Sequence, residues 1–161
     1  MSELFVLDFP YPRVGAIEFR PLSRNDYTKG VCKVLSQLTT CETSKKRFEE
    51  VFDAIQSHSN YFVIVAEDIE THQIVTMGTL LVESKFIHGG SNVGHIEDIV
   101  VSQEYRGLDL GKVLITTLLE IGKIEKCYKV ILDCNDKVLK FYEKCGLTKH
   151  GNCMAHYYIE Q

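Results

Sequence analysis

The spacing of hydrophobic positions predicts one strand and one helix near the start of the chain. Residues 14–19 form a short apolar run typical of a strand, after an N-terminal extension over residues 1–13. We expect a helix over about 27–37 to follow, with Asn25 or Asp26 as its cap, because both side chains can accept a hydrogen bond from a free backbone N–H group.

A second helix and three strands are predicted next. Ser44 can cap the helix, and three runs rich in β-branched and apolar residues, 61–65, 74–82 and 95–101, read as strands. Short polar loops join these runs, so we expect an antiparallel meander. The apolar face of the helix consists of Phe48, Val51, Phe52 and Ile55.

The last third of the chain changes to alternating helices and strands. Helical spacing over 110–121 is followed by a buried strand at 128–132 and then by another helix, for which Asn135 is a suitable cap and Gly146 a suitable stop. The apolar stripe of this last helix consists of Val138, Phe141, Tyr142 and Cys145.

A final strand is expected at about 153–159, which completes the order β-α-α-β-β-β-α-β-α-β. The 161 residues suffice for one core, so we expect a single α/β domain, α+β by layout, over residues 14–161.

Composition and charge exclude several classes of protein. The net charge of −4 and the pI near 5.9 leave no basic stripe for nucleic acid or an anionic membrane, so an anionic ligand would need a local binding device. The six cysteines are scattered without metal-ligand spacing, which favours reduced thiols and no metal. Without an apolar run of membrane-spanning length or a basic N-terminal leader, we expect a soluble, cytoplasmic protein.

The clearest local motif is a glycine-bearing turn between a strand and a helix, Tyr105-Arg106-Gly107-Leu108-Asp109-Leu110-Gly111-Lys112. Unpaired N–H groups and the positive end of the helix dipole meet at such a turn, which suits a phosphate. An ordinary solvated loop remains the alternative. The segment is neither a Walker A loop, which would need Ser or Thr where Val113 stands, nor a dinucleotide fingerprint.

Together with three further segments, this turn resembles the GNAT acetyltransferases and, within them, the eukaryotic glucosamine-6-phosphate N-acetyltransferase family. The GNAT diphosphate motif is Gln/Arg-x-x-Gly-x-Gly/Ala, and residues 106–111 match it at both ends but carry Asp109 where glycine is usual. The other matching segments are 94–101, 127–134 and 140–146, and the resemblance covers residues 17–154. It implies a mixed central sheet with splayed middle strands, flanked by helices.

The resemblance implies acetyl-CoA as co-substrate, held by two groups of residues. The backbone of the strand at Ile99, Val100 and Val101 would hold the pantetheine arm and the thioester. The diphosphate and the rest of the coenzyme would contact the turn and the last helix: Arg106, Gly107, Leu108, Asp109, Leu110, Gly111, Lys112, Tyr142, Glu143 and Lys144.

The resemblance also implies a sugar-phosphate site. The expected substrate-binding residues are Thr39, Lys85, Phe86, Ile87, His88, Glu97, Asp98, Tyr128, Lys129, Asp133 and Tyr157. One departure from the family bears on this site. The family has a C-terminal Met-x-x-Arg motif, whose arginine reaches the phosphate across a dimer interface. This sequence has Met154-Ala155-His156-Tyr157 at that place. A bidentate cationic donor is thereby lost.

Three residues are candidates for catalysis. Asp133 follows a predicted buried strand, and the resemblance implies that it orients the amine; the alternative is an acid that caps the next helix. The resemblance also implies that Tyr142 protonates the departing thiolate; the alternative is a core tyrosine. Glu97 and Asp98 interrupt an apolar strand. Because side chains alternate along a strand, we expect the two carboxylates on opposite faces. The alternative is an edge charge that discourages strand pairing.

The resemblance therefore implies a homodimer with C-terminal strands at its interface, which acetylates glucosamine 6-phosphate for UDP-N-acetylglucosamine synthesis. A GNAT enzyme for another small amine and a non-catalytic acyl-CoA-binding module remain alternatives. Asp133 and Tyr142 speak against the latter, because a mere binder needs neither.

Overall fold

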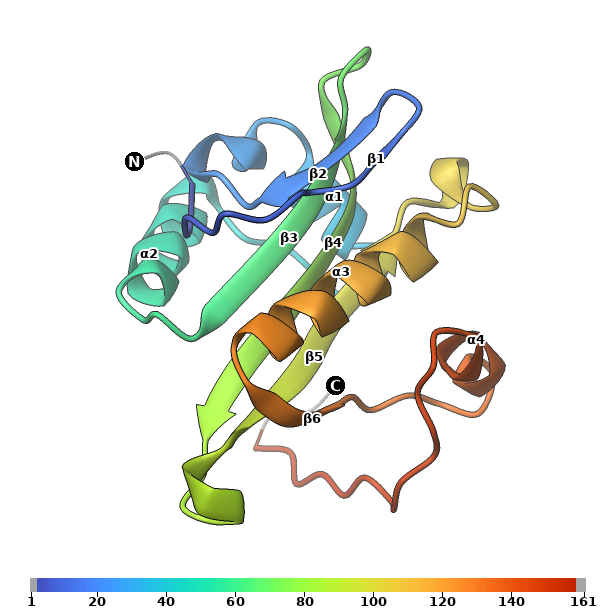
Figure 1. Ribbon diagram of the computed structural model, residues 1–161. Coiled ribbons are helices and arrows are strands. Elements are labelled where there is room, and N and C mark those ends of the chain that lie inside the picture. The colour runs from blue at the N-terminus through green and yellow to red at the C-terminus, as the bar shows by residue number, and fades with distance from the viewer. Residues whose placement is uncertain (1–2, 159–161) are drawn as a thin grey trace.

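The computed structural model describes residues 3–158, which build one mixed sheet with helices on both faces (Figure 1). The strand order within these residues is β1-β2-β3-β4-β5-β6. All neighbouring pairs are antiparallel except β5 and β6, which are parallel. The strands are β1 Arg13–Val14, β2 Ile17–Pro21, β3 Tyr61–Asp68, β4 Gln73–Ser84, β5 Asn92–Val101 and β6 Cys127–Ile131.

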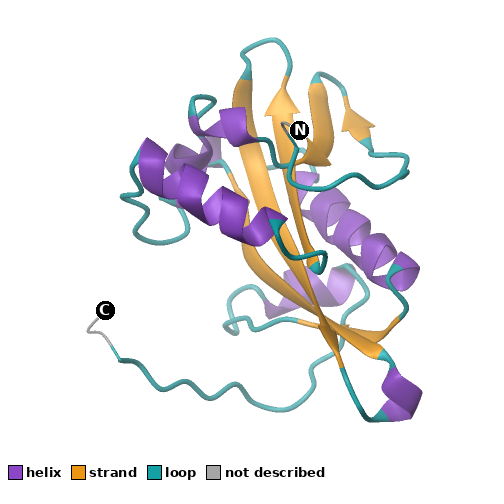
Figure 2. Ribbon diagram, turned by 90° about the vertical axis from the view of Figure 1, so that its left-hand side faces the viewer, coloured by secondary structure: helices purple, strands orange, loops and turns teal. Residues whose placement is uncertain are grey.

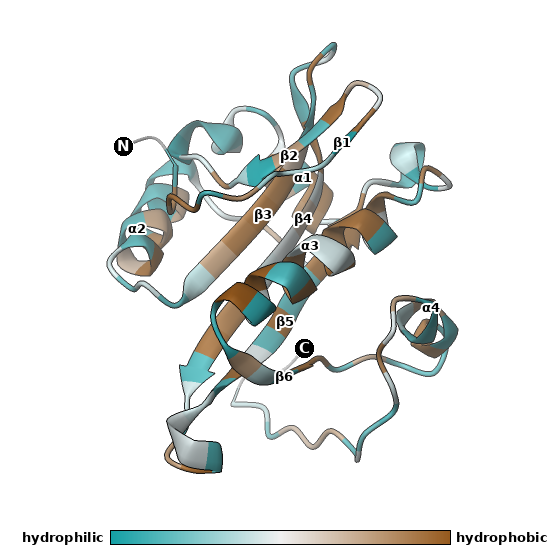
Figure 3. Cartoon of the chain, viewed as in Figure 1, coloured by the Kyte–Doolittle hydropathy of each residue, from teal (hydrophilic) through white to brown (hydrophobic). Residues whose placement is uncertain are grey.

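The three strands predicted for the middle of the chain are confirmed as β3, β4 and β5. Each extends a few residues beyond its prediction, and the two hairpin connections are as expected. β3 and β4 are buried over almost their whole length, because helices cover both faces of the sheet there, and Figure 3 shows hydrophobic residues along them. These two strands therefore form the rigid centre of the molecule.

The strand predicted over 14–19 is divided between β1 and β2, because the chain turns at Gly15 with a φ of +59°. The segment before β1 contacts the rest of the domain. Leu4 is buried, and its N–H group donates to the carbonyl of Leu22 at 2.7 Å. Residues 1 and 2 of the predicted extension lie outside the described residues.

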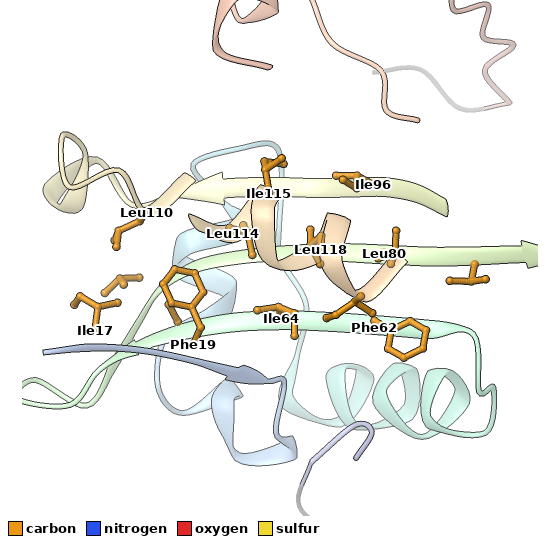
Figure 4. Packing of buried hydrophobic residues seen from close by; sticks show 14 residues of the cluster. Ile17, Phe19, Phe62, Ile64, Leu80, Ile96, Leu110, Leu114, Ile115 and Leu118 are labelled. Carbon is orange, nitrogen blue, oxygen red and sulfur yellow. The ribbon is translucent and has the colours of Figure 1, made fainter. Parts of the chain in front are cut away.

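The helices pack on the two faces of the sheet, each over its own hydrophobic cluster (Figure 2). α1 (Val31–Leu35) and α2 (Lys45–Gln56) cover one face, and α3 (Leu110–Ile124) covers the other. Figure 4 shows Leu114 and Leu118 of α3 among side chains from the strands. The predicted α2 and α3 are confirmed, and Ser44 caps α2 by accepting from the N–H group of Arg47 at 3.2 Å.

The helix predicted over 27–37 is wrong in length and in its cap. A 3₁₀ helix, η1 (Arg24–Tyr27), comes first, and Gly30 with a φ of +83° separates it from α1. Asn25 and Asp26 lie inside η1. The buried carboxylate of Asp26 accepts from Arg20 Nη1 and Nη2 at 2.8 and 2.7 Å, because an uncompensated buried charge would be costly.

The last helix, α4 (Leu139–Lys144), is shorter than predicted, and Asn135 is not its cap. Val138 holds the N-cap position, while Asn135 Oδ1 accepts from the N–H group of Lys137 at 3.0 Å in a local turn. Gly146 follows the helix with a φ of +90°, the left-handed conformation expected of a helix-ending glycine.

The strand predicted over 153–159 is wrong for residues 153–158, and residue 159 lies outside the described residues. These six residues form an exposed coil that runs away from the sheet (Figure 2). Short alternating runs read as strands only where a neighbouring strand completes the hydrogen bonds, and no strand of the described chain pairs with this one. No helix among residues 3–158 has the length and apolar character needed to cross a membrane.

Candidate active site

The site begins where the pairing of β5 with β6 ends. The parallel ladder joins Asn92 to Cys127 and ends at the pair of His95 and Ile131. Beyond that pair, no strand of the described residues lies against the outer edge of β5, so residues 96–101 hydrogen-bond to β4 on one side alone. The backbone groups that point outward from this edge are free to bind a ligand.

A β-bulge lies within this open edge. Met77 of β4 pairs with Val100 and Thr79 with Glu97, so β5 advances by three residues where β4 advances by two. Asp98, within these three residues, adopts a φ of +54°. The alternation expected for Glu97 and Asp98 does not hold, because the extra residue interrupts the strand, and both side chains are exposed. The bulge turns two neighbouring carboxylates toward solvent at the centre of the open edge.

Asp133 joins these two carboxylates from the end of β6. Burial raises the pKa of Glu97 above its usual range, and the negative charges of Asp98 and Asp133 raise it further. Asp133 is exposed and does not cap α4, whose N-cap is Val138, so that alternative is wrong. The three side chains make a carboxylate cluster that suits an amine or ammonium group.

Tyr142 of α4 shares a cavity with one member of the carboxylate cluster. The cavity, of about 670 Å³, is lined by both Tyr142 and Asp133. The pKa of Tyr142 is raised, first by burial and then by the neighbouring Cys134 and Cys145, so the hydroxyl keeps its proton at neutral pH. Tyr142 packs against the hydrophobic core, as the alternative of a core tyrosine expects, and also lines the cavity with Asp133.

Close packing ties α4 to the start of α3. A Cβ atom on Gly111 would lie 3.1 Å from Cζ of Phe141, so a side chain at this position of α3 would push against α4. Phe141 and Tyr142 are in edge-to-face contact, with ring centroids 5.0 Å apart. Gly111 therefore helps to set the distance between Tyr142 and the glycine turn.

The glycine turn presents an uncapped helix N-terminus. The N-cap of α3 is Asp109, whose side chain accepts no hydrogen bond from the helix; the first N–H groups of this 15-residue helix lack a capping side chain within the described residues. Gly107 and Asp109 have φ values of +85° and +58°. Asp109 is exposed and is a residue type that tolerates this left-handed conformation, which explains how it replaces the usual glycine.

At the opposite end of β5, the expected phosphate-binding residues converge only in part. The rings of His88 and Tyr128 lie 4.3 Å apart, and Lys129 Nζ is 5.6 Å from the centre of the Tyr128 ring. Lys129 forms no ion pair with any described residue and is available to an anion. Lys85 instead forms an ion pair with Glu83, the carboxylate that also accepts from His95 Nε2 at 2.8 Å.

Other expected residues are dispersed. Phe86 and Ile87 project into solvent at the β4–β5 hairpin, and Tyr157 is exposed on the C-terminal coil. Thr39 follows α1, and no hydrogen bond or ion pair among the described residues joins it to the hairpin. Glu143 lines the cavity beside Tyr142, whereas Lys144 is exposed at the end of α4.

Several residues of the site were missed in the sequence. Glu83 and His95 face each other only because of the β4–β5 register, which hydrophobic patterning does not fix to the residue. Cys153 lines the cavity near Asp133, whose carboxylate raises the pKa of the thiol, but it lies in a segment predicted to be a strand. The charged Glu83 in an otherwise apolar run was the one available signal.

Comparison with known proteins decides the family. The family model described as the acetyltransferase (GNAT) family matches residues 29–147. The chain belongs to this acetyltransferase family. The splayed β5 and β6, the mixed sheet and the uncapped start of α3 in this acetyltransferase are the features that the resemblance led us to expect.

Relatives of the acetyltransferase match over most of its length. Glucosamine 6-phosphate N-acetyltransferase 1 of Dictyostelium discoideum is 46% identical over 142 residues, 88% of this chain and 90% of the relative. The crystal structure of glucosamine-6-phosphate N-acetyltransferase from Arabidopsis thaliana superposes with a TM-score of 0.86 at 35% identity, covering 89% of this chain and 99% of that one. An acetyltransferase structure from Trypanosoma brucei gives a TM-score of 0.82 at 37% identity, covering 88% and 99%.

The carboxylate cluster predicts a pH-dependent stability. Since the pKa of Glu97 is raised in the folded protein, its ionised form costs stability at neutral pH, and the cost disappears below the ordinary glutamate pKa of about 4.3, where both states are protonated. Glu97→Gln should therefore raise the thermal midpoint at pH 7.5 and raise it much less at pH 4, measured by circular dichroism.

Glu120→Gln is the matched control for that measurement, because Glu120 is exposed on α3 outside the carboxylate cluster. Glu120→Gln should have the same small effect on the thermal midpoint at both pH values. A Glu97→Gln variant that is less stable than the wild type at pH 7.5 would show that the cluster does not disfavour the ionised form.

Proposed function

We propose that this acetyltransferase transfers the acetyl group of acetyl-CoA to the amine of glucosamine 6-phosphate, giving N-acetylglucosamine 6-phosphate. The carboxylate cluster of Glu97, Asp98 and Asp133 carries the proposal, because one of its members, Asp133, lines the same cavity as Tyr142. An amine needs a carboxylate and a leaving thiolate needs a proton donor, and these are the two kinds of group that the cavity joins. The names and coverage of the relatives support the same substrate.

Acetyl-CoA would bind across the open edge of β5. The uncapped N–H groups at Leu110, Gly111 and Lys112 suit its diphosphate, with Arg106 as a nearby cation. Outward-facing backbone groups of β5 suit the amides of the pantetheine arm, as expected for Ile99, Val100 and Val101. In this orientation the thioester would reach the bulge, between the carboxylate cluster and α4.

The reaction would proceed by direct attack. The carboxylates of Asp133 and Glu97 would orient the amine and accept its proton while its nitrogen bonds to the thioester carbon. As the carbon–sulfur bond breaks, Tyr142 would give its proton to the departing sulfur. The raised pKa of Tyr142 supports this role, since the hydroxyl is protonated at neutral pH before the thiolate leaves.

The phosphate of the sugar would lie toward the β4–β5 hairpin. Lys129 is the available cation there, next to His88 and Tyr128, and Lys85 would contribute after separating from Glu83. Tyr157, in place of the usual arginine, can donate a single hydrogen bond. Binding of the phosphate is therefore proposed to depend more on Lys129 than on the C-terminal coil.

We also propose that the acetyltransferase forms a homodimer through its C-terminal residues and supplies UDP-N-acetylglucosamine synthesis in the cytoplasm. The unpaired edge of β6 and the exposed apolar side chains on the C-terminal coil support the dimer. Its six free cysteines suit a reducing compartment. The exposed side chains of the coil are Met154, Tyr157 and Tyr158.

Substrate choice is tested by thiol release from acetyl-CoA with three acceptors. Glucosamine 6-phosphate should give a kcat/KM at least about tenfold higher than glucosamine or a lysine peptide, the effect of roughly one charge-assisted contact. Lys129→Met should reduce this preference and leave the rate with glucosamine unchanged. Equal rates with the phosphorylated and unphosphorylated sugars would contradict the phosphate assignment.

Tyr142→Phe tests the proton donor. The turnover number should fall by roughly 100-fold or more, the usual contribution of a general acid, while the dissociation constant of acetyl-CoA, measured by calorimetry, should change little. Tyr27→Phe, which alters a tyrosine packed on Phe48 beneath α2, is the control and should retain full turnover. A Tyr142→Phe enzyme with normal turnover would remove this hydroxyl from the mechanism.

Removal of residues 153–161 tests the dimer. For the full chain, sedimentation should give a mass twice that of one 18.4-kDa chain. For the shortened chain, it should give the mass of one chain. A dimer that persists without these residues would place the interface elsewhere.

A further inference from the structure

Two side chains from distant parts of the sequence hold the turn that leads into the glycine motif. This turn, η3 (Gln103–Tyr105), follows β5 directly. The hydroxyl of Tyr105 donates to Asp68 Oδ2 at 2.7 Å, and the N–H group of Gln103 donates to Gln37 Oε1 at 2.8 Å. β3 supplies Asp68, and the residues after α1 supply Gln37, so both anchors come from the N-terminal half of the chain.

Asp68 is itself held rigidly. It is buried at the end of β3, and its Oδ1 atom accepts from the N–H groups of Glu70 and Thr71 at 2.9 and 3.4 Å. These bonds fix one carboxylate oxygen in the β3–β4 turn and leave the other for Tyr105. The hydrogen bond from Tyr105 lowers the pKa of Asp68, so Asp68 remains an anion at neutral pH and the bond is charge-assisted.

No comparable anchor exists between Tyr105 and the helix. The four residues 106–109 are exposed. Their two polar side chains, Arg106 and Asp109, form no hydrogen bond or ion pair with any described residue. The path of these four residues is therefore set by the start of α3 on one side and by Tyr105 on the other. Such a segment loses conformational freedom when it closes on a ligand, and an anchor reduces that loss.

We propose that the Tyr105–Asp68 hydrogen bond, supported by Gln37, positions the glycine turn and thereby sets the affinity for acetyl-CoA. Asp68 and Tyr105 act as positioning residues: they hold the segment that presents the N–H groups and touch neither the amine nor the reacting carbonyl. The proposal rests on the proposed function, since it takes the turn as the diphosphate site. It separates coenzyme affinity from acceptor binding, because the carboxylate cluster lies at the bulge of β5 and the end of β6, and Lys129 lies on β6.

The test removes one oxygen atom. Tyr105→Phe keeps the ring in the core and deletes the hydrogen bond to Asp68. We expect the dissociation constant of CoA by calorimetry, and KM for acetyl-CoA, to rise about three- to tenfold. The turnover number at saturation and KM for the amino sugar should stay within about twofold, and amide hydrogen exchange over residues 103–110 should accelerate.

Two further variants make the assignment specific. Tyr61→Phe is the matched control, because its hydroxyl has no hydrogen-bond partner among the described residues, and it should leave CoA binding unchanged. Asp68→Asn keeps an oxygen that can accept but removes the charge, so its effect should be smaller than that of Tyr105→Phe. If both act through one hydrogen bond, the double variant should bind CoA no more weakly than Tyr105→Phe alone.

The outcomes distinguish the two proposals. Wild-type protein that does not bind CoA would contradict the proposed function itself. Wild-type protein that binds CoA, with a Tyr105→Phe variant that binds equally well, would overturn the positioning role alone. An equal loss of affinity for both substrates would also overturn it, because a general loss of stability explains that result.

Discussion

The active site depends on a sheet that stops pairing halfway along one strand. β5 pairs with β4 over its whole length but with β6 only as far as His95, and the bulge at Asp98 lies in the part of β5 that β6 does not reach. Backbone groups left unpaired in this way are costly when buried unless a partner satisfies them. They stay exposed at the open edge, where a ligand with amide groups of its own can pair with them as another strand would. The irregularity that weakens the sheet is thus what creates room for a long, extended co-substrate.

The charges of the site are ordered along β5. Cations lie by the hairpin at its start, three carboxylates lie around its bulge, and an uncapped helix N-terminus follows its end. A strand of ten residues spans about 33 Å, so groups of opposite sign remain far enough apart to act separately in a screening solvent. A protein with a net negative charge can therefore bind two anionic substrates, because each anion interacts mainly with the positive groups close to it. In the proposed binding mode, the same order would place the amine next to the thioester and direct the two phosphorylated ends of the substrates away from each other.

The predictions succeeded where hydrophobic patterning alone decides the structure and failed where single polar contacts decide it. The periodic runs of β3, β4, β5 and α3 were predicted within a few residues, because each buries a continuous face. Asp26 was expected to cap the helix over 27–37; it accepts instead from the N–H group of Ser23 at the start of η1, and it pairs with Arg20. Asn135 closes a local turn instead of starting α4. The residues of the site came mostly from a family resemblance; the anchors Gln37 and Asp68 lie outside its motifs and became visible only through their contacts with η3.

The two halves of the chain contribute differently to the site. The C-terminal half supplies the groups proposed to react, whereas the N-terminal half supplies the rigid frame. In that frame Arg20 bridges Asp26 and Glu67, Lys29 also binds Glu67, and Asp68 follows immediately on β3. A network in which every buried charge has a partner resists deformation, because moving one group would leave another unpaired. Asp68 follows Glu67 of this network directly, and it holds Tyr105 at the start of the glycine turn. The network therefore restricts the position of the turn through Asp68. An ion-pair network far from the chemistry can thus influence coenzyme binding through a single hydrogen bond, and the sequence separation of 37 residues between its partners explains why local sequence patterns cannot reveal it.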